Sequence, residues 1–385
     1  MRTAGRRLAA ATLHALSIPF HERFRHAEAD RAACDSVVVR VVDGEGAEGW
    51  GEGAPRPYVT GETVATMLAD LRAAWPAIAG AELPRLDGPE DLAALQAGLP
   101  APPGGALRGA ARAAMELAVI DCVLRRSGRS LSSLLPPRRA TVRYSGVIGA
   151  AGPERARAIA TVLRTFGITE VKVKVGFPGD LDAVRSVRAA LGPRASIRVD
   201  ANGAWRPEEA LRSIAHLAEL GVECVEQPLP RGDVAELAEL RARSPLPLMA
   251  DESVVTVADA RALAAAAAVD RFNLRVSKCG GLAPCLAIAV IAHEAGIGVQ
   301  VGCQVGETAI LSAAGRHLAA GLDRLLHAEG SFGEVLLVQD LGRSPVHFGL
   351  CGEAAPLRGP GLGVEIDAGR VSRWARRTIE LGAGR

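Results

Sequence analysis

The stretch VKVKVGFPGDLDAVRSVRAALGPRASIRVDAN, residues 171–202, contains two β-rich runs on either side of a helix-like run. The same alternation, with helix-like runs rich in Ala, Leu, Glu and Arg, extends from residue 141 to residue 331. An alternation of this kind is typical of βαβ units, which build a parallel sheet. We count eight β-rich runs, at 141–149, 171–176, 196–202, 222–228, 247–253, 271–278, 298–304 and 325–331.

Polar residues end successive runs at nearly constant intervals. They are separated by 26, 26, 25, 27 and 26 positions, and they are Lys174, Asp200, Glu226, Asp251, Lys278 and Gln304. Equal intervals indicate equivalent points on successive strands, as in a closed (β/α)-barrel. The alternative is an open doubly wound sheet, which usually has a Gly-rich phosphate-binding turn that residues 141–152 match poorly. We therefore predict an α/β protein with a modified, TIM-like (β/α)-barrel.

The regions on either side of the barrel lack this period. A strand-like run at 11–20 and a hairpin at 35–55, with its turn near Asp43, precede a long helix at 107–126. The length of 385 residues fits a barrel of roughly 250 residues with a smaller domain. We expect three parts: an α+β capping domain at 1–135, a catalytic barrel at 136–335, and a C-terminal segment at 336–385 that packs on the capping domain.

The composition argues against several kinds of partner. The net charge is +2 and no charge block stands out, so neither nucleic acid nor a membrane surface is implied. No apolar run approaches the ~18 residues of a membrane span.

The seven cysteines form no C-x-x-C pair, which favours a reducing compartment, and we expect a cytoplasmic protein. Arg6 and Arg7 before an apolar run weakly resemble a signal peptide, but we expect a first β-strand ending near Ile18.

Lysine is almost absent, and this makes its few positions informative. Of the 45 basic residues only three are lysine, at Lys172, Lys174 and Lys278, and the other 42 are arginine. Arginine stays protonated in proteins, whereas a buried lysine can lose its proton and act as a base. A chain that otherwise uses arginine throughout therefore directs attention to these three positions for chemistry.

Three carboxylates, Asp200, Glu226 and Asp251, end consecutive predicted strands. At the mouth of a barrel they would repel one another without a cation, and such hard oxygen ligands suit Mg²⁺ or Mn²⁺. The alternative is that they cap the N-termini of the following helices. That alternative fits the two aspartates but not Glu226, because Glu is a poor cap. We therefore predict a metal site.

Lys172 and Lys174 lie two positions apart on one strand, so both side chains point to the same face. The valines that alternate with them are expected to face the helices, which places both lysines in the barrel interior. Neighbouring ammonium groups lower each other's pKa, and this is a way to make a lysine basic near neutral pH. The alternative is that both lysines are solvated on an edge strand, and this would require the strand period described above to be wrong.

Lys278 ends the sixth predicted strand and Lys174 the second, and these strands are opposite in a ring of eight. A substrate held between the two amines could lose its α-proton to one and regain a proton from the other, which inverts the stereocentre. A metal would stabilise the enediolate formed between these steps. Glu307 and Glu329, at the ends of the last two strands, could orient the substrate or assist a lysine. For Glu329 a structural salt bridge to an arginine is an equal alternative.

These motifs resemble those of the enolase superfamily, in its muconate lactonizing enzyme subgroup. The resemblance covers nearly the whole chain, and the order and spacing of the motifs make it specific. The His-Asp pair of the mandelate racemase subgroup is missing. The matching motifs are K-x-K (Lys172, Lys174), D-x-N (Asp200, Asn202), E-Q-P (Glu226, Gln227, Pro228), D-E-S (Asp251, Glu252, Ser253) and K-x-G-G (Lys278, Gly280, Gly281).

The resemblance implies that the three carboxylates bind Mg²⁺ and that Lys174 and Lys278 are the acid/base pair. It implies that Lys172 modulates Lys174 or touches the substrate carboxylate. The family's Glu after the seventh strand falls on Glu307. The resemblance also implies a homo-oligomer, a dimer or an octamer, and a small-molecule carboxylate as substrate.

Further contacts with the substrate are expected from the motifs and from the capping domain. Asn202 and Glu252 belong to the D-x-N and D-E-S motifs. Two loops of the capping domain, at 20–31 and 55–63, would close over the barrel, and they contain Arg25 and Tyr58. We expect Arg25 to meet a second acidic group on the substrate.

Two positions depart from the family pattern. Arg275 stands where the family often has lysine. Dipeptide epimerases of the family commonly carry Asp-x-Asp at the eighth strand, whereas HAEGSFG (327–333) offers only Glu329.

Several reactions of the subgroup use the same residues. We favour racemisation or epimerisation of an N-acylated or otherwise modified amino acid, because both lysines are present. A muconate-like cycloisomerase and a syn-dehydratase are the alternatives within the family. A non-catalytic barrel that only binds a ligand is the alternative from another class, but it predicts erosion of the site motifs.

Overall fold

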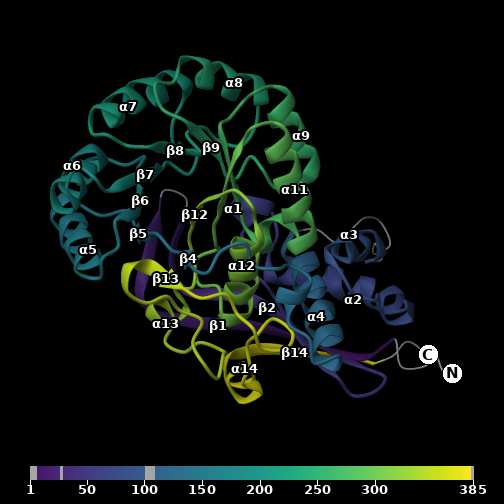
Figure 1. The fold of residues 1–385 in the computed structure, drawn as a ribbon. Coiled ribbons are helices and arrows are strands. Elements are labelled where there is room, and N and C mark those ends of the chain that lie inside the picture. Colours follow the sequence, from purple (N-terminus) through teal and green to yellow (C-terminus); the bar gives the residue numbers. More distant parts are fainter. Residues whose placement is uncertain (1–6, 27–28, 100–108, 383–385) are drawn as a thin grey trace.

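The computed structural model describes residues 7–26, 29–99 and 109–382. A four-stranded antiparallel sheet lies beside an eight-stranded parallel sheet that curves into a ring, with helices around its outer side (Figure 1). This arrangement confirms the predicted fold class. No helix among these residues is long and apolar enough to cross a membrane.

The antiparallel sheet joins the two ends of the chain. Its order is β14-β1-β2-β3, and in Figure 1 the yellow C-terminal strand lies beside the purple first strand. Because β14 pairs with β1, as in the pair Ile379–Leu13, the C-terminal segment completes the capping sheet as predicted. The strands are β1 (Leu8–His26), β2 (Ala29–Asp43), β3 (Glu48–Gly53) and β14 (Ala375–Gly382).

The turn between β2 and β3 is the predicted one, because the Asp43 carboxylate accepts hydrogen bonds from the backbone of Glu45 and Ala47. Two helices, α2 (Val64–Gly80) and α4 (Gly109–Arg126), pack on the capping sheet. The short α1 (Pro57–Thr60) follows β3, and α3 (Pro89–Gly98) packs against α11 (Leu282–Glu294) of the barrel.

Glycines on β3 bring the sheet unusually close to α4. A Cβ built at Gly51 would overlap the backbone carbonyl of Ala114, and the same holds for Gly49 with Ala118. Because alternate residues of a strand share one face, the sequence EGWGEG presents a flat glycine face to the helix. The helix predicted at 107–126 is confirmed over its described residues.

The prediction of a loop at 20–31 is wrong for those of its residues that the structure describes. β1 and β2 continue there as a hairpin, with Phe24 opposite Arg31 and a register irregularity after Pro19. This charged stretch lacks the alternating pattern of a strand, so the sequence did not predict one. It forms strands because its two arms pair with each other. The tip, residues 27–28, lies outside the described residues.

The parallel sheet contains its eight strands in sequence order. The segment directly before its first strand meets its last strand at a parallel bridge between Tyr144 and Ala328, beside a 2.8 Å hydrogen bond from Ser145 N to Ala328 O. This contact closes the ring. The strands are β5 (Gly146–Ile148), β6 (Glu170–Lys174), β7 (Ser196–Asp200), β8 (Cys224–Glu226), β9 (Leu248–Ala250), β10 (Arg271–Leu274), β11 (Gly298–Val301) and β12 (Leu325–Ala328).

Helices follow the strands and cover the outside of the ring (Figure 1). They are α5 (Pro153–Thr165), α6 (Asp180–Leu191), α7 (Pro207–Glu219), α8 (Val234–Arg243), α9 (Val257–Ala265), α10 (Val276–Cys279), α11 (Leu282–Glu294) and α12 (Ala309–Gly321). Short elements complete the chain, namely η2 (Leu131–Ser133), β4 (Val142–Arg143), α13 (Gly333–Leu336), η3 (Leu350–Gly352), β13 (Glu353–Ala354) and α14 (Ala368–Trp374).

Candidate active site

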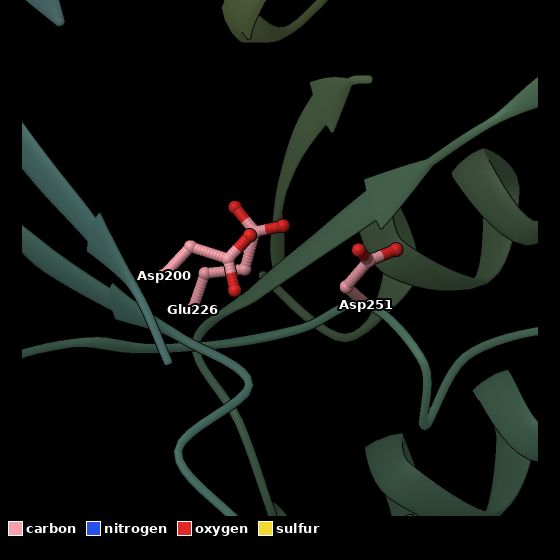
Figure 2. Close-up of side chains that lie close together, drawn as sticks. All are labelled: Asp200, Glu226 and Asp251. Atoms are coloured by element: carbon pink, nitrogen blue, oxygen red, sulfur yellow. The ribbon is translucent and has the colours of Figure 1, made fainter. Parts of the chain in front are cut away.

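Three buried carboxylates meet at the C-terminal ends of neighbouring strands. Asp200 ends β7, Glu226 ends β8 and Asp251 follows β9, and each side chain is at most 1% exposed. Figure 2 shows the side chains of Asp200 and Glu226 next to each other and that of Asp251 beyond them. One ligand atom from each lies within 4.8 Å of the others. Because Mg²⁺ binds oxygen at about 2.0–2.1 Å, one ion could contact all three after small movements.

Lys172 and Lys174 both point into the ring, as their spacing predicted, and are 2% and 7% exposed. Lys172 Nζ donates to Glu226 Oε1 at 2.9 Å and lies 3.0 Å from Asp200 Oδ2. Lys174 Nζ donates to Asp200 Oδ2 at 2.6 Å and to Asn202 Oδ1 at 2.7 Å.

The predicted effect of the two lysines on each other is wrong for Lys172. Burial lowers the pKa of this ammonium, but the neighbouring Asp200, Glu226 and Glu329 carboxylates outweigh burial and raise the pKa above its usual value. Lys172 is therefore a fixed positive charge beside the carboxylate cluster.

Lys278 lies beyond its strand rather than at its end. β10 stops at Leu274, and Lys278 sits on the single turn of α10. Its Nζ donates to Asp251 Oδ1 at 2.8 Å and to the backbone oxygens of Asp251 and Asn273, each at 2.7 Å. Burial lowers the pKa of Lys278 to about 8. Because β6 and β10 are separated by β7, β8 and β9 in the sheet, Lys174 and Lys278 approach the cluster from opposite arcs of the ring.

A cavity of about 340 Å³ lies next to the carboxylate cluster and is lined by residues adjoining it, among them Asn202 and Glu252. Lys172 and Lys174 line it, whereas Lys278 does not. Its polar lining also includes four residues that the sequence had singled out, Asn202, Glu252, Glu307 and Glu329, and Tyr58 reaches it from the capping domain. Arg25 belongs to β1, but its side chain lies outside the described part of the structure, so its role stays a prediction.

The buried glutamates of the cavity differ in their surroundings. Burial raises the pKa of Glu252 to about 7 and that of Glu307 to about 8. Glu252 accepts a hydrogen bond from Asn202 Nδ2 at 3.1 Å, and Glu307 accepts one from the backbone of Gln304 at 2.6 Å.

Glu329 instead bridges two cations, Lys172 and Arg198, at 3.0 Å each. Burial raises the pKa of its carboxyl, but the two cations hold it at about 2. The salt bridge anticipated for Glu329 is thus present.

Several residues of the site were missed or undervalued in the sequence. Arg275 lines the cavity, its guanidinium contacts the Asp251 carboxylate, and its Nη1 donates to Gln304 Oε1 at 3.1 Å. Asn273 Nδ2 donates to Glu226 Oε1 at 2.7 Å. Asn273 is one of only two asparagines in the chain, a signal that could have identified it. Arg198 could not be identified in this way, because arginine is common throughout the chain.

A comparison with known protein families identifies the chain. Residues 154–370 match the family described as enolase C-terminal domain-like. The chain belongs to the enolase superfamily. Its relatives are epimerases, racemases and muconate cycloisomerases of the muconate lactonizing enzyme subgroup, so the predicted family and enzyme class are confirmed.

Two curated relatives represent two of these activities. A hydrophobic dipeptide epimerase of Enterococcus faecalis is 32% identical over 361 residues, which cover 91% of this chain and 98% of that protein. Muconate cycloisomerase 1 of Rhodococcus opacus is 31% identical over 373 residues, which cover 94% of this chain and 96% of that protein.

Solved structures agree with this assignment. The N-succinyl Arg/Lys racemase of Bacillus cereus superposes with a TM-score of 0.89 at 26% identity, covering 97% of this chain and all of that one. The dipeptide epimerase of E. faecalis, in complex with Mg and the dipeptide L-Leu-L-Tyr, superposes with a TM-score of 0.84 at 29% identity, covering 93% of this chain and 99% of that one. Mg²⁺ is thus bound in a homologue, and the buried carboxylates Asp200, Glu226 and Asp251 could hold it here.

Proposed function

We propose that this enzyme racemises or epimerises an N-acylated or otherwise modified amino acid by moving the proton on the carbon next to its carboxylate. The observation that carries the proposal is the pair of buried lysines on opposite arcs of the ring. Lys174 donates to Asp200 and Lys278 to Asp251, so each amine is anchored to a different carboxylate of the same cluster.

The mechanism needs one amine on each side of the α-carbon. In one direction Lys174 Nζ, in its neutral form, accepts the α-proton and becomes an ammonium, and the ammonium of Lys278 gives its proton to the opposite face. The reverse direction exchanges their roles, so no proton is gained or lost overall. A positioned acid or base contributes about 10²- to 10⁴-fold to the rate.

Other side chains stabilise the charge that develops during proton removal. Mg²⁺ bound by Asp200, Glu226 and Asp251 would supply positive charge beside the substrate carboxylate. Lys172 adds a second positive charge, because the carboxylates of Asp200, Glu226 and Glu329 raise its pKa. Burial of these groups excludes water and strengthens their interaction with the substrate.

Similarity supports the same reaction class. The relatives include the hydrophobic dipeptide epimerase and the N-succinyl Arg/Lys racemase, whose names describe inversion of a stereocentre. The N-acylated class is favoured because Glu329, the residue at the β12 end, is already paired with two cations.

Cycloisomerisation is the second candidate, favoured by the similarity to muconate cycloisomerase 1 over 94% of the chain. It would use one of the lysines as an acid on a substrate with a conjugated double bond.

The test is incubation with Mg²⁺ in D₂O of a panel of carboxylates, followed by proton NMR. The panel contains N-acetyl, N-propionyl and N-succinyl amino acids, dipeptides and muconate-like diacids. Loss of the α-proton signal from an amino acid derivative, together with appearance of the other stereoisomer, is the expected result. A new product from a diacid without α-proton exchange in any derivative would replace the racemase proposal by a cycloisomerase.

A further inference from the structure

The end of β12 forms one wall of the cavity, and its hydrogen-bonding groups are arranged in an unusual way. Ser331 lines the cavity three residues beyond the strand and is 4% exposed. Its φ of 58° lies in the left-handed region, which a residue other than Gly, Asn or Asp rarely adopts. A strained residue that lines a cavity suggests a function for its side chain.

The Ser331 hydroxyl is oriented by a buried guanidinium. Arg316, on α12, donates from Nη2 to Ser331 Oγ at 3.0 Å and to the backbone oxygen of His347 at 2.8 Å. Its Nε donates to the Tyr144 hydroxyl at 3.2 Å, and the group stacks over the Tyr144 ring at 5.3 Å. With these contacts and 4% exposure, Arg316 is held in one position.

This contact decides which hydrogen bond Ser331 can offer to a substrate. A guanidinium has only donors, so Arg316 uses an acceptor position of the hydroxyl oxygen and leaves the hydroxyl proton available. Among the residues that the structure describes, no acceptor takes this proton. The proton can therefore be given to an acceptor in the cavity.

The acidic group nearest in sequence is engaged elsewhere. Glu329 pairs with Lys172 and Arg198, both buried, so its charge is compensated within the protein. A substrate ammonium placed here would meet a carboxylate that two cations already neutralise, and it could use only the remaining lone pair of the Ser331 hydroxyl oxygen as an acceptor at that residue. Burying an ammonium without an opposite charge is costly.

Another part of the cavity wall is apolar. It is formed by α5, by β5 and by the segment around α13, and its apolar residues are Val147, Ile159, Leu163, Phe332, Val335 and Leu336. Such a wall fits an alkyl or aryl group rather than a second charge.

We propose that Ser331 and Arg316 determine the specificity of the site by donating a hydrogen bond to an uncharged acyl oxygen on the substrate's N-substituent, so that the enzyme selects apolar N-acyl amino acids over those carrying a free ammonium. Ser331 is the contact residue and Arg316 the positioning residue. This inference rests on the proposed racemase or epimerase function and adds the chemistry of the substituent.

The experiment compares two substrates that differ in one group. N-propionyl-leucine and alanyl-leucine share the three-carbon acyl chain and the leucine α-carbon to invert, and they differ only in the ammonium that the dipeptide carries. If the panel identifies another amino acid as better, the same pair is made on it. We expect the wild-type enzyme to exchange the α-proton of the propionyl compound with a kcat/KM at least 10-fold higher.

Two variants of Ser331 test the hydrogen bond without threatening the fold. Ser331→Gly suits the positive φ and removes the hydroxymethyl side chain, and it should lower kcat/KM for the propionyl compound by about 3- to 10-fold, the usual effect of one hydrogen bond. Ser331→Asp, also tolerated at this φ, replaces the donor by an acceptor and should move the preference toward the dipeptide. Arg316→Lys keeps the charge but loses the planar fork, and it should change the ratio between the two substrates through KM.

The outcomes separate the inference from the proposed function. Equal kcat/KM for the two wild-type substrates, or an unchanged ratio in all three variants, would overturn the specificity inference and leave the racemase intact. A wild-type enzyme that exchanges no α-proton in any derivative would remove both. A purely structural role of Arg316 would lower both activities equally and leave their ratio unchanged.

Discussion

Replacing Glu329 by Gln should destabilise the barrel strongly, although only one charge changes. Glu329 accepts from Lys172 through Oε2 and from Arg198 Nη2 through Oε1, each at 3.0 Å, and its side chain is 5% exposed. The amide of Gln can accept only one of these two hydrogen bonds and turns its NH₂ toward the other cation.

The loss falls mainly on Arg198. Lys172 keeps Glu226 and Asp200 as partners. Arg198 is fully buried and keeps only Ser145, and its Nε and Nη1 have no hydrogen-bond partner among the described residues. A hydrogen bond to a charged group contributes about 1.5–3 kcal/mol, and breaking a buried ion pair from one side costs about 3–5 kcal/mol. We therefore expect Glu329→Gln to lower the free energy of unfolding by about 3 kcal/mol.

Urea denaturation followed by circular dichroism measures this change. Glu353→Gln is the control, because Glu353 also pairs with an arginine, Arg143, but at the surface, and a surface change should stay within about 0.5 kcal/mol. Adding Arg198→Met to Glu329→Gln should restore part of the stability, because it removes the unpaired buried charge. A loss below about 1 kcal/mol in Glu329→Gln would show that Arg198 does not depend on Glu329, which would refute the reasoning.

Three further predictions follow from other parts of the structure. Asp251→Asn should weaken Mg²⁺ binding at least 10-fold in isothermal titration calorimetry, and unchanged affinity would remove Asp251 from the metal site. The hydrogen bond from His327 lowers the pKa of Glu223 below its usual 4.5. This pair therefore stabilises the fold above about pH 4.5 and loses that contribution as the pH falls. His327→Gln should flatten the acid side of the curve of unfolding free energy against pH, and an unaltered curve would contradict the pairing. Gly51→Ala should lower the free energy of unfolding by about 3 kcal/mol, because its Cβ meets the backbone of α4. Gly232→Ala, with open space around its Cβ, should change it little. Equal midpoints of urea denaturation for the two variants would refute the close packing of β3 on α4.

The strand order and the carboxylate cluster could be predicted from the sequence because they depend on a local, repeated pattern. Each repeat of the barrel places its last strand residue at the same rim, so equal intervals between Lys174, Asp200 and Glu226 translate directly into proximity. The packing of the C-terminal segment on the capping domain could also be anticipated, because the segment after the barrel lacked the repeat, but its pairing as a strand with β1 could not.

Other features depend on tertiary contacts that leave no local pattern. Residues 275–278 continue the β-like sequence of β10, yet they form a helical turn. The hydrogen bond from Cys279 N to Arg275 O closes this turn, and Gly280 and Gly281 follow it at positive φ. This turn moved Lys278 off its strand. The domain boundaries, the oligomeric state and the role of Arg25 stay predictions.

Electrostatics were the least predictable part of the site. Lys172 was expected to have a lowered pKa because of a lysine two positions away, but Asp200, Glu226 and Glu329 surround it and raise its pKa. Glu329 lies 157 positions from Lys172 and 131 from Arg198 in sequence. Only the closure of the ring brings these groups together, so no short motif could reveal the balance of charge.

The most direct test of the two-base proposal is α-proton exchange in D₂O, measured separately on each enantiomer of the best substrate with Lys174→Arg and Lys278→Arg. Arginine keeps the positive charge but cannot act as a base, so each variant should lose exchange of one enantiomer by at least about 10²-fold and retain exchange of the other, with the affected enantiomer opposite in the two variants. If both variants instead lose exchange of the same enantiomer, or keep exchange of both, the two lysines do not act on opposite faces of the substrate.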